Sequence, residues 1–184
     1  MMNKKYLLAG LFAASLGTTS IAAAGAGDTY AGFSLGNVSQ DASGINIDDT
    51  IGWRIFGGYA LNDVLAIEGG YISFGDADLT VPGFSNVSAS VEVTGFEIAT
   101  VGNLPINSQF SLFGKVGLLF WDAEISASNS SGSASASETD SDVFFGVGGQ
   151  YEISGNLAIR GSWERYATGD IDIDFLSASA VFGF

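Results

Sequence analysis

The chain ends in the stretch Phe175-Leu176-Ser177-Ala178-Ser179-Ala180-Val181-Phe182-Gly183-Phe184. Successive side chains of a strand point to opposite faces, so one face of this stretch collects the apolar residues Leu176, Ala178, Ala180, Phe182 and Phe184. The other face holds mostly small side chains. A strand that is apolar outward, small or polar inward and aromatic at its end is what a transmembrane β-barrel requires as its closing strand. We therefore predict a fold made of membrane-crossing strands.

The amino-terminal end predicts export. Lys4 and Lys5 precede an apolar run over residues 6–16, and Ala22-Ala23-Ala24 forms a small-x-small cleavage site. We interpret residues 1–24 as a cleaved secretory signal peptide, with cleavage after Ala26 as the alternative. A membrane anchor is the rival interpretation, but the run is shorter than the ~20 residues that a bilayer-spanning helix requires. Residues 25–184 are then the barrel domain.

Composition narrows the class of function. The 184 residues fit one domain, and 26 Gly with only 2 Pro suit many closely packed strands. The sequence contains no Cys, which excludes disulfides and thiolate metal sites. It also contains no His, which removes the commonest general base and the commonest transition-metal ligand. We predict no enzymatic activity and no cofactor.

Alternation with a period of two recurs along the chain in segments of about ten residues, the length of a tilted membrane strand. We predict eight such strands, at residues 30–38, 51–60, 65–74, 91–101, 110–121, 143–153, 157–166 and 175–184. Short turns follow the second, fourth and sixth strands, and long polar linkers follow the first, third and fifth, the longest at 122–142. This asymmetry indicates short periplasmic turns, long extracellular loops and both termini in the periplasm.

Two neighbouring segments, Trp53-Arg54-Ile55-Phe56-Gly57-Gly58-Tyr59 and Ala66-Ile67-Glu68-Gly69-Gly70-Tyr71, combine with the terminal Phe184 in a resemblance to a known family. Over essentially the whole mature chain they resemble the small OmpA/OmpX-like, opacity-type barrels of Gram-negative bacteria. The resemblance implies a monomeric, all-β, eight-stranded antiparallel up-and-down transmembrane β-barrel in the outer membrane, surrounded by lipid and lipopolysaccharide. It also implies that Phe184 is a signal read by the barrel-assembly machinery. A soluble lipocalin-type barrel is the structural rival, but it would not turn so many large apolar residues outward.

Strand parity places six charged side chains inside the barrel, three of each sign: Arg54, Glu68, Glu97, Lys115, Arg160 and Glu164. If the fourth and fifth strands pair symmetrically about Ile106, Glu97 lies directly opposite Lys115, where opposite charges attract. An eight-stranded barrel is barely wide enough for its own side chains. We therefore predict a plug of ion pairs. A gated polar channel, or two-carboxylate chemistry through Glu97 and Glu164, is the alternative.

The outer loops are predicted to be strongly acidic. Of the 6 basic residues, Lys4 and Lys5 belong to the predicted signal and three face the predicted lumen, which leaves Arg165. The opposing carboxylates are Asp41, Asp48, Asp49, Asp76, Asp78, Glu92, Asp122, Glu124, Glu138, Asp140, Asp142, Asp170, Asp172 and Asp174. Such a collar suits a cationic partner or divalent cations, or it serves only solubility, and it disfavours nucleic acid.

The alternating Asp170, Asp172 and Asp174 are the candidates for a Ca²⁺ site, although carboxylates on one strand edge can equally be solvated. Taken together, the sequence favours a non-enzymatic outer-membrane barrel with a plugged lumen and a structural or surface-interaction role. A narrow channel for small solutes is the alternative function.

Overall fold

The computed structural model describes residues 27–42, 45–46, 49–80, 88–129, 132–168 and 171–184. Its strands are β1 (Thr29–Ala42), β2 (Ile45–Asn46), β3 (Thr50–Ala60), β4 (Leu65–Thr80), β5 (Ser88–Pro105), β6 (Phe110–Asn129), β7 (Gly132–Ser154), β8 (Leu157–Thr168) and β9 (Ile171–Gly183). No helix in these ranges is long and apolar enough to cross a membrane. The predicted signal peptide lies outside the described residues.

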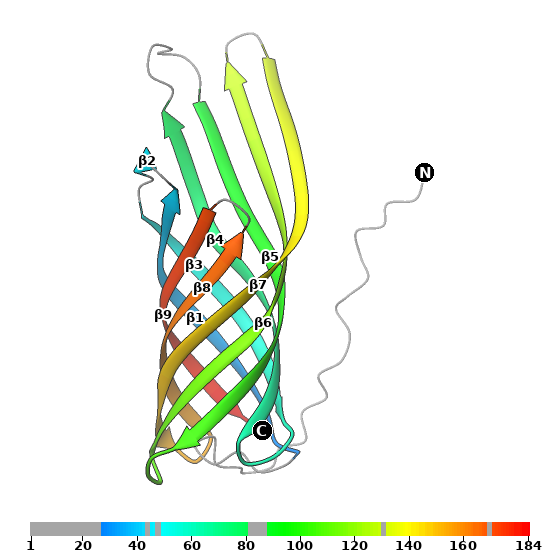
Figure 1. The fold of residues 1–184 in the computed structure, drawn as a ribbon. Coiled ribbons are helices and arrows are strands. Elements are labelled where there is room, and N and C mark those ends of the chain that lie inside the picture. The colour runs from blue at the N-terminus through cyan, green and yellow to red at the C-terminus, as the bar shows by residue number, and fades with distance from the viewer. Residues whose placement is uncertain (1–26, 43–44, 47–48, 81–87, 130–131, 169–170) are drawn as a thin grey trace.

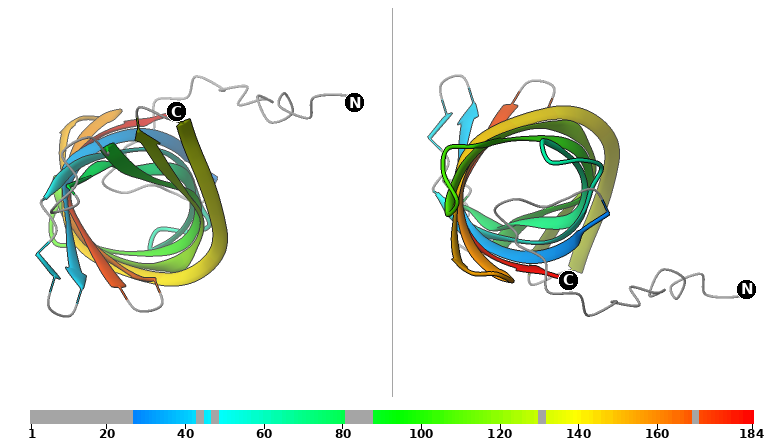
Figure 2. Two further views of the ribbon diagram at one scale, coloured as in Figure 1. Left: turned by 90° about the horizontal axis from the view of Figure 1, so that it is seen from above. Right: turned by 90° about the horizontal axis from the view of Figure 1, so that it is seen from below.

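Eight of these strands close into one antiparallel barrel (Figures 1 and 2). Each of the long strands pairs with its neighbour in the chain, and β1 pairs with β9 to complete the ring. The two-residue strand β2 pairs only with the end of β1, at Asp41 and Ala42. The prediction of an eight-stranded, up-and-down antiparallel barrel is confirmed.

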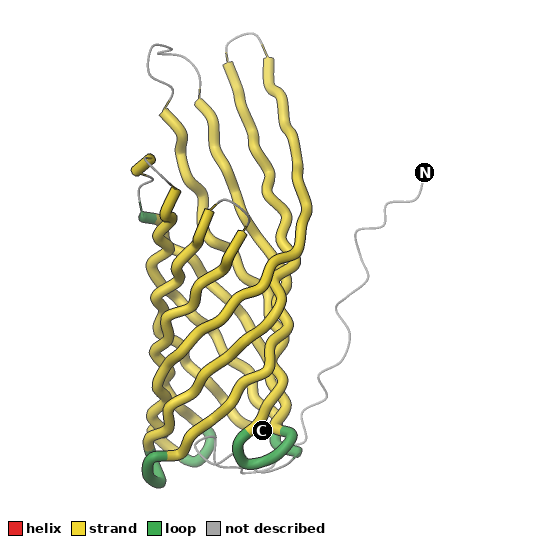
Figure 3. Tube along the Cα trace, in the orientation of Figure 1, coloured by secondary structure: helices red, strands yellow, loops and turns green. Residues whose placement is uncertain are grey.

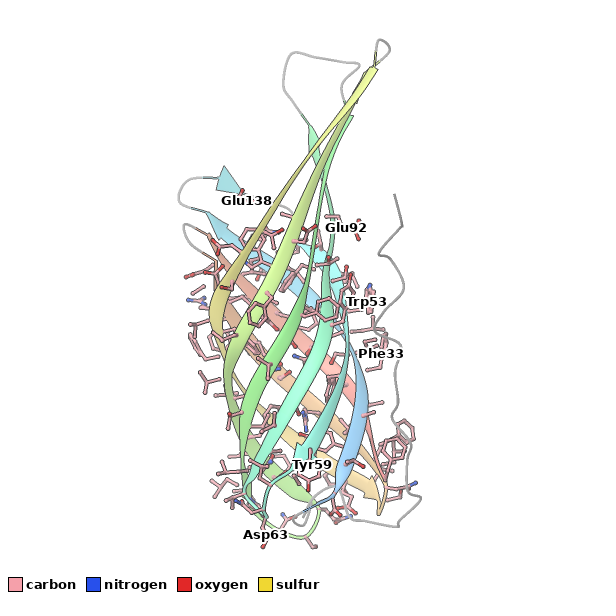
Figure 4. The ribbon with its side chains drawn as sticks, turned by 90° about the vertical axis from the view of Figure 1, so that its right-hand side faces the viewer. Phe33, Trp53, Tyr59, Asp63, Glu92 and Glu138 are labelled. Carbon is pink, nitrogen blue, oxygen red and sulfur yellow. The ribbon has the colours of Figure 1, made fainter. Side chains whose placement is uncertain are left out.

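Side chains alternate strictly between the inside and the outside of the wall. In β3, Trp53, Ile55 and Tyr59 are 37%, 51% and 49% exposed, whereas Arg54 and Phe56 between them are 1% and 6% exposed. The other strands follow the same pattern, and the outward residues are large and apolar. In Figure 4 Phe33, Trp53 and Tyr59 mark the course of this outer surface. The core of the protein is therefore the lumen, and the apolar exterior suits contact with lipid.

The turns that lead into β4 and β6 share one design. The Asn62 side chain accepts hydrogen bonds from the backbone N–H groups of Val64 and Leu65, both at 2.9 Å. Asn107 does the same for Gln109 and Phe110, at 2.9 and 2.8 Å. An asparagine that satisfies the backbone ahead of it is a common way to build a tight turn. These turns lie at the same end of the barrel as the carboxyl terminus (Figure 3).

The hairpins at the other end differ from the prediction of long loops. The predicted linker at 122–142 is wrong, because β6 and β7 pair continuously from Phe110 opposite Tyr151 to Asn129 opposite Gly132. Likewise β4 and β5 pair as far as Thr80 opposite Ser88. Alternating serine and alanine carry no signal of burial, yet they have the period of a strand and keep the backbone ladder intact.

These prolonged hairpins stand above the barrel as one four-stranded sheet (Figure 1). We call it the extension, and it consists of residues 76–80, 88–94, 122–129 and 132–142. A β-bulge between Ser73 and Asp76 marks the point where β4 leaves the barrel wall. Gly75 lies in this bulge with a φ of 84°, a backbone conformation that suits glycine.

Candidate functional site

The lumen is layered, as the inward residues of β8 show. In order along the strand these are Ala158, Arg160, Ser162, Glu164 and Tyr166, all buried. Ala158 belongs to a lower apolar cluster near the short turns, made of Tyr30, Phe56, Ala66, Val101, Phe113, Ala158 and Val181. Tyr166 belongs to an upper apolar cluster, made of Val38, Ile72, Phe74, Ala99, Leu119, Phe144, Tyr166, Ile173 and Phe175. The charged side chains therefore lie between two apolar layers.

The upper charged group centres on Glu164. Its Oε2 atom lies 2.5 Å from Nη1 of Arg54 and 3.0 Å from Nζ of Lys115. The same Arg54 atom lies 3.5 Å from Oε2 of Glu97. The Tyr166 hydroxyl is within hydrogen-bond distance of Glu97 Oε1, at 2.5 Å, and of Glu164 Oε2, at 2.8 Å. Two cations thus neutralise two carboxylates, with all four charged side chains buried.

The lower charged group consists of Arg160 and Glu68. Their Nη1 and Oε1 atoms are 2.6 Å apart. Arg160 also donates from Nε and Nη2 to Oε1 of Gln150, at 3.2 and 3.0 Å, while the Tyr30 hydroxyl donates to Glu68 Oε1 at 2.9 Å. The Arg160 guanidinium lies 4.6 Å from the centre of the Phe113 ring. This group is also neutral, and the guanidinium packs against an aromatic ring of the lower cluster.

The predicted pairing of Glu97 with Lys115 is wrong. Glu97 lies opposite Leu119, and Lys115 lies opposite Val101. Because β5 continues to Pro105, which lies opposite Ser111, the hairpin is symmetric about Ser108 rather than Ile106. The partner of Glu97 therefore shifts by four residues along β6. An even shift keeps the parity of the strand, so both side chains still face inward but reach different partners.

Aromatic rings fill the space beside the charges. A Cβ atom added at Gly32 would overlap the Phe56 ring, and one added at Gly58 would overlap the Tyr30 ring. The two rings therefore lie directly on the wall of the barrel at these glycines. The Arg54 guanidinium lies 5.0 Å from the centre of the Phe56 ring, so the upper charged group contacts the lower cluster. Side chains thus occupy the interior of the barrel at the level of the charges.

Three residues of these groups went unnoticed in the sequence: Tyr30, Gln150 as a partner of Arg160, and Tyr166. Tyr166 follows Glu164 by two residues, so strand parity alone places both on the same face. In the described part of the chain, Arg54 Nε is the one fully buried side-chain polar atom without a hydrogen-bond partner. The network is otherwise satisfied, as buried polar groups require.

Outside the lumen, the candidate calcium ligands Asp172 and Asp174 lie beside Arg165. Arg165 forms a two-pronged contact with Asp174, at 2.7 and 2.6 Å, and lies 3.8 Å from Asp172. Two of the three candidate ligands therefore face a cation. Asp170 lies outside the described residues, as does Asp48. No group of three or more Asp or Glu residues suited to a metal ion occurs among the residues that the structure describes.

Four of the exposed carboxylates lie in the extension. Glu92, Asp122, Glu138 and Asp140 are exposed. Figure 4 shows Glu92 and Glu138 in the upper part of the molecule, whereas Asp63 lies in a short turn at the bottom. At the other end Phe184 donates its backbone N–H to the carbonyl of Thr29 at 2.8 Å, which places the last residue at the junction of β1 and β9.

Comparisons with known proteins agree on the fold. Residues 8–184 match the model of the family described as outer membrane protein beta-barrel domain. A search of curated proteins finds no significant match. Similar solved structures include Ail, the attachment invasion locus protein of Yersinia pestis, in complex with the heparin analogue sucrose octasulfate, with 18% identity and a TM-score of 0.67 over 86% of this chain and 99% of that chain.

Two further structures have the same architecture at lower identity. Neisserial surface protein A is 14% identical with a TM-score of 0.68, over 86% of this chain and 99% of that chain. The N-terminal β-barrel domain of Pseudomonas aeruginosa OprF is 13% identical with a TM-score of 0.57, over 88% of this chain and all of that chain. Likenesses at these identities concern the fold.

Proposed function

The chain belongs to the family of outer membrane protein β-barrel domains, and we propose that it is a non-enzymatic barrel with a closed lumen that acts at the cell surface through its extension. The observation that carries this proposal is the layered lumen with its two charged groups. Three cations and three carboxylates pair within 3.5 Å between two apolar clusters. Ions crossing such a barrel would have to displace both the ion pairs and the rings.

The same arrangement argues against catalysis. Glu97 and Glu164, the candidate pair of carboxylates, both contact Arg54 and the hydroxyl of Tyr166. Carboxylates held in ion pairs below an apolar cluster have no access to a substrate from outside. The sequence also contains no His to act as a base.

The surface role follows from the charge of the extension. We propose that both termini face the periplasm, since the short turns lie at their end of the barrel. The extension then faces the outside of the cell and is acidic. We propose that the protein is a monomer surrounded by lipid and lipopolysaccharide. Phe184 would be the signal by which the assembly machinery places it there. Sucrose octasulfate, the ligand in the Ail structure, is a polyanion. The carboxylates of this extension favour a partner of the opposite charge.

A conductance measurement tests the closed lumen. We expect purified protein in planar bilayers to show no steady ion current. A variant with Tyr30→Ala, Phe56→Ala and Arg54→Ala removes two rings and one cation from the interior and should conduct, which shows that the assay detects an opened barrel. Arg165→Gln, outside the lumen, serves as the matched control and should stay silent. A steady, cation-selective current through the parent protein would replace this proposal with the narrow-channel function.

A further inference from the structure

One edge of the extension has no partner. β7 pairs with β6 along its whole length, but it pairs with β8 only from Phe144, which lies opposite Tyr166. Over residues 132–142 the other side of β7 has no neighbouring strand in the part of the chain that the structure describes. Figure 1 shows this stretch rising above the end of β8. An edge of this kind presents a row of backbone hydrogen-bonding groups to the surroundings.

Hydrogen bonds elsewhere in β7 show which residues point their backbone N–H and C=O groups to this edge. The N–H of Glu152 donates to the carbonyl of Gln109 at 2.8 Å, toward the β6 side. In an antiparallel pair the backbone groups of successive residues point alternately to one neighbour and to the other. The unbroken register between β6 and β7 carries this alternation upward, so Thr139 and Ser141 point their backbone groups away from β6. Consistent with this, the Ser141 N–H donates to the carboxylate of Asp140, at 2.7 Å, and not to a strand.

The edge is longer than the opposite edge of the extension. On the other side, β4 is unpaired with β3 over residues 74–80, which is seven residues. The stretch of β7 covers 132–142, which matches the length of a full strand. The β7 edge is therefore the better template for an added strand.

The acidic residues beside the free edge of β7 determine which kind of strand can pair with it. Glu138 and Asp140 are exposed beside the edge, and Asp122 is exposed on the neighbouring β6. The sequence of residues 122–142 contains no Lys or Arg. An acidic edge repels a second copy of itself, because the same carboxylates would meet across the new pair. It attracts a segment whose side chains carry positive charge.

We propose that the free edge of β7 binds an extended cationic polypeptide segment as an additional antiparallel strand, with its basic side chains toward Glu138 and Asp140. This inference rests on the proposed surface function and names the partner of the extension. Backbone hydrogen bonds supply the attachment and the carboxylates supply the selectivity, as in other cases where a peptide joins the edge of a sheet.

The test uses the full barrel refolded in a zwitterionic detergent. The probe is a peptide of about ten residues that alternates lysine and threonine, and its acidic twin carries glutamate in place of lysine. We expect saturable binding of the basic peptide by fluorescence anisotropy, weakening as salt is raised, and no binding of the acidic twin. Binding of both peptides alike would overturn the charge argument.

Matched variants locate the site. Thr139→Pro removes a backbone N–H that points to the free edge and keeps the β6 ladder, so it should weaken binding by about tenfold or more. Thr139→Val, like Thr139→Pro, loses the hydroxyl and its 2.9 Å hydrogen bond to Asp122, but it keeps the backbone N–H and should bind as the parent does. Asp140→Asn should weaken binding, whereas Asp63→Asn, an exposed carboxylate in a short turn at the other end, should not.

Two results would overturn the proposal. If Thr139→Pro binds the peptide as well as Thr139→Val does, the edge is not the site. If light scattering shows a dimer of the parent that Thr139→Pro abolishes, the edge pairs with a second copy instead. Neither result changes the conductance of the parent, so this test and the test of the closed lumen fail separately.

Discussion

The extension continues two of the hairpins that form the barrel, yet its charged residues are arranged differently from those in the lumen. Inside the barrel, three of the four buried carboxylates, Glu68, Glu97 and Glu164, each lie within 3.5 Å of a cation. In the extension, the register sets Asp76 opposite Glu92 on one side and Glu124 opposite Glu92 on the other, three acidic residues in one row. Like charges directly opposite each other destabilise a sheet.

Access to water explains why charges are paired in the lumen but not in the extension. A charge removed from water costs several kcal/mol unless a partner and hydrogen bonds replace its hydration. The lumen therefore requires pairing, residue by residue. Charges that remain in water are screened and interact with energies of about 1 kcal/mol or less. The extension tolerates a row of acidic residues, which is consistent with a position outside the bilayer.

The largest effect is expected at Glu164, because Arg54 and Lys115 both depend on it. Replacing Glu164 with Met leaves buried cations short of a partner and should lower the free energy of unfolding by about 3 to 5 kcal/mol. Lys115→Met is the matched variant. It leaves Glu164 paired with Arg54, so its cost should be smaller, about 1.5 to 3 kcal/mol.

Urea titrations in lipid vesicles, followed by tryptophan fluorescence, measure both variants. If both substitutions lower the free energy of unfolding by the same small amount, water screens the charges inside the barrel. The lumen would then require paired charges no more than the extension does.

The next effect concerns the rings that lie on the wall glycines. Gly58→Ala places a methyl group where the Tyr30 ring lies and should destabilise the barrel by about 1 to 3 kcal/mol through overpacking. Gly161→Ala is the matched control, because no atom lies within 4 Å of its added Cβ. Its effect should stay within about 0.5 kcal/mol. Equal unfolding midpoints for the two alanine variants would contradict a filled interior.

The smallest effect is expected in the extension. Glu92→Lys introduces a cation between two acidic cross-strand neighbours, Asp76 and Glu124, and should stabilise the local pairing by about 0.2 to 1 kcal/mol. Slower amide hydrogen exchange in residues 88–94 would report this gain, and it should fade at high salt. Glu92→Gln, which removes charge without adding the opposite sign, should give an intermediate result. Faster exchange in Glu92→Lys than in the parent would mean that the acidic row is not repulsive.

Alternation along the strands was enough to predict the barrel and the direction of its side chains. The rule of period two decides between inside and outside for residues such as Arg54 and Trp53, because a shift of one residue would expose every buried side chain to lipid. The same rule would have found Tyr166, which shares the parity of Glu164.

Register was beyond the reach of that rule. Glu97 and Lys115 keep their inward direction for any even shift of the register between β5 and β6. Their cross-strand partners therefore depend on the position of the turn. The side chain of Asn107 fixes the turn, through hydrogen bonds that no periodicity reveals. The length of the β6–β7 hairpin was missed for a related reason, since serine and alanine pair well through the backbone without a pattern of hydrophobicity.

The junction of β1 and β9 has a consequence for the way this protein folds. Ser34 and Ser179 are hydrogen-bonded across this junction at 2.9 Å, although 145 residues separate them in the chain. Closing so long a loop is entropically costly and slow, and the reward comes only when the last strand arrives. A chain halted before β9 would expose the backbone edges of β1 and β8 to hydrocarbon, where nothing can hydrogen-bond them. Insertion and closure must therefore occur together, as one late and cooperative event.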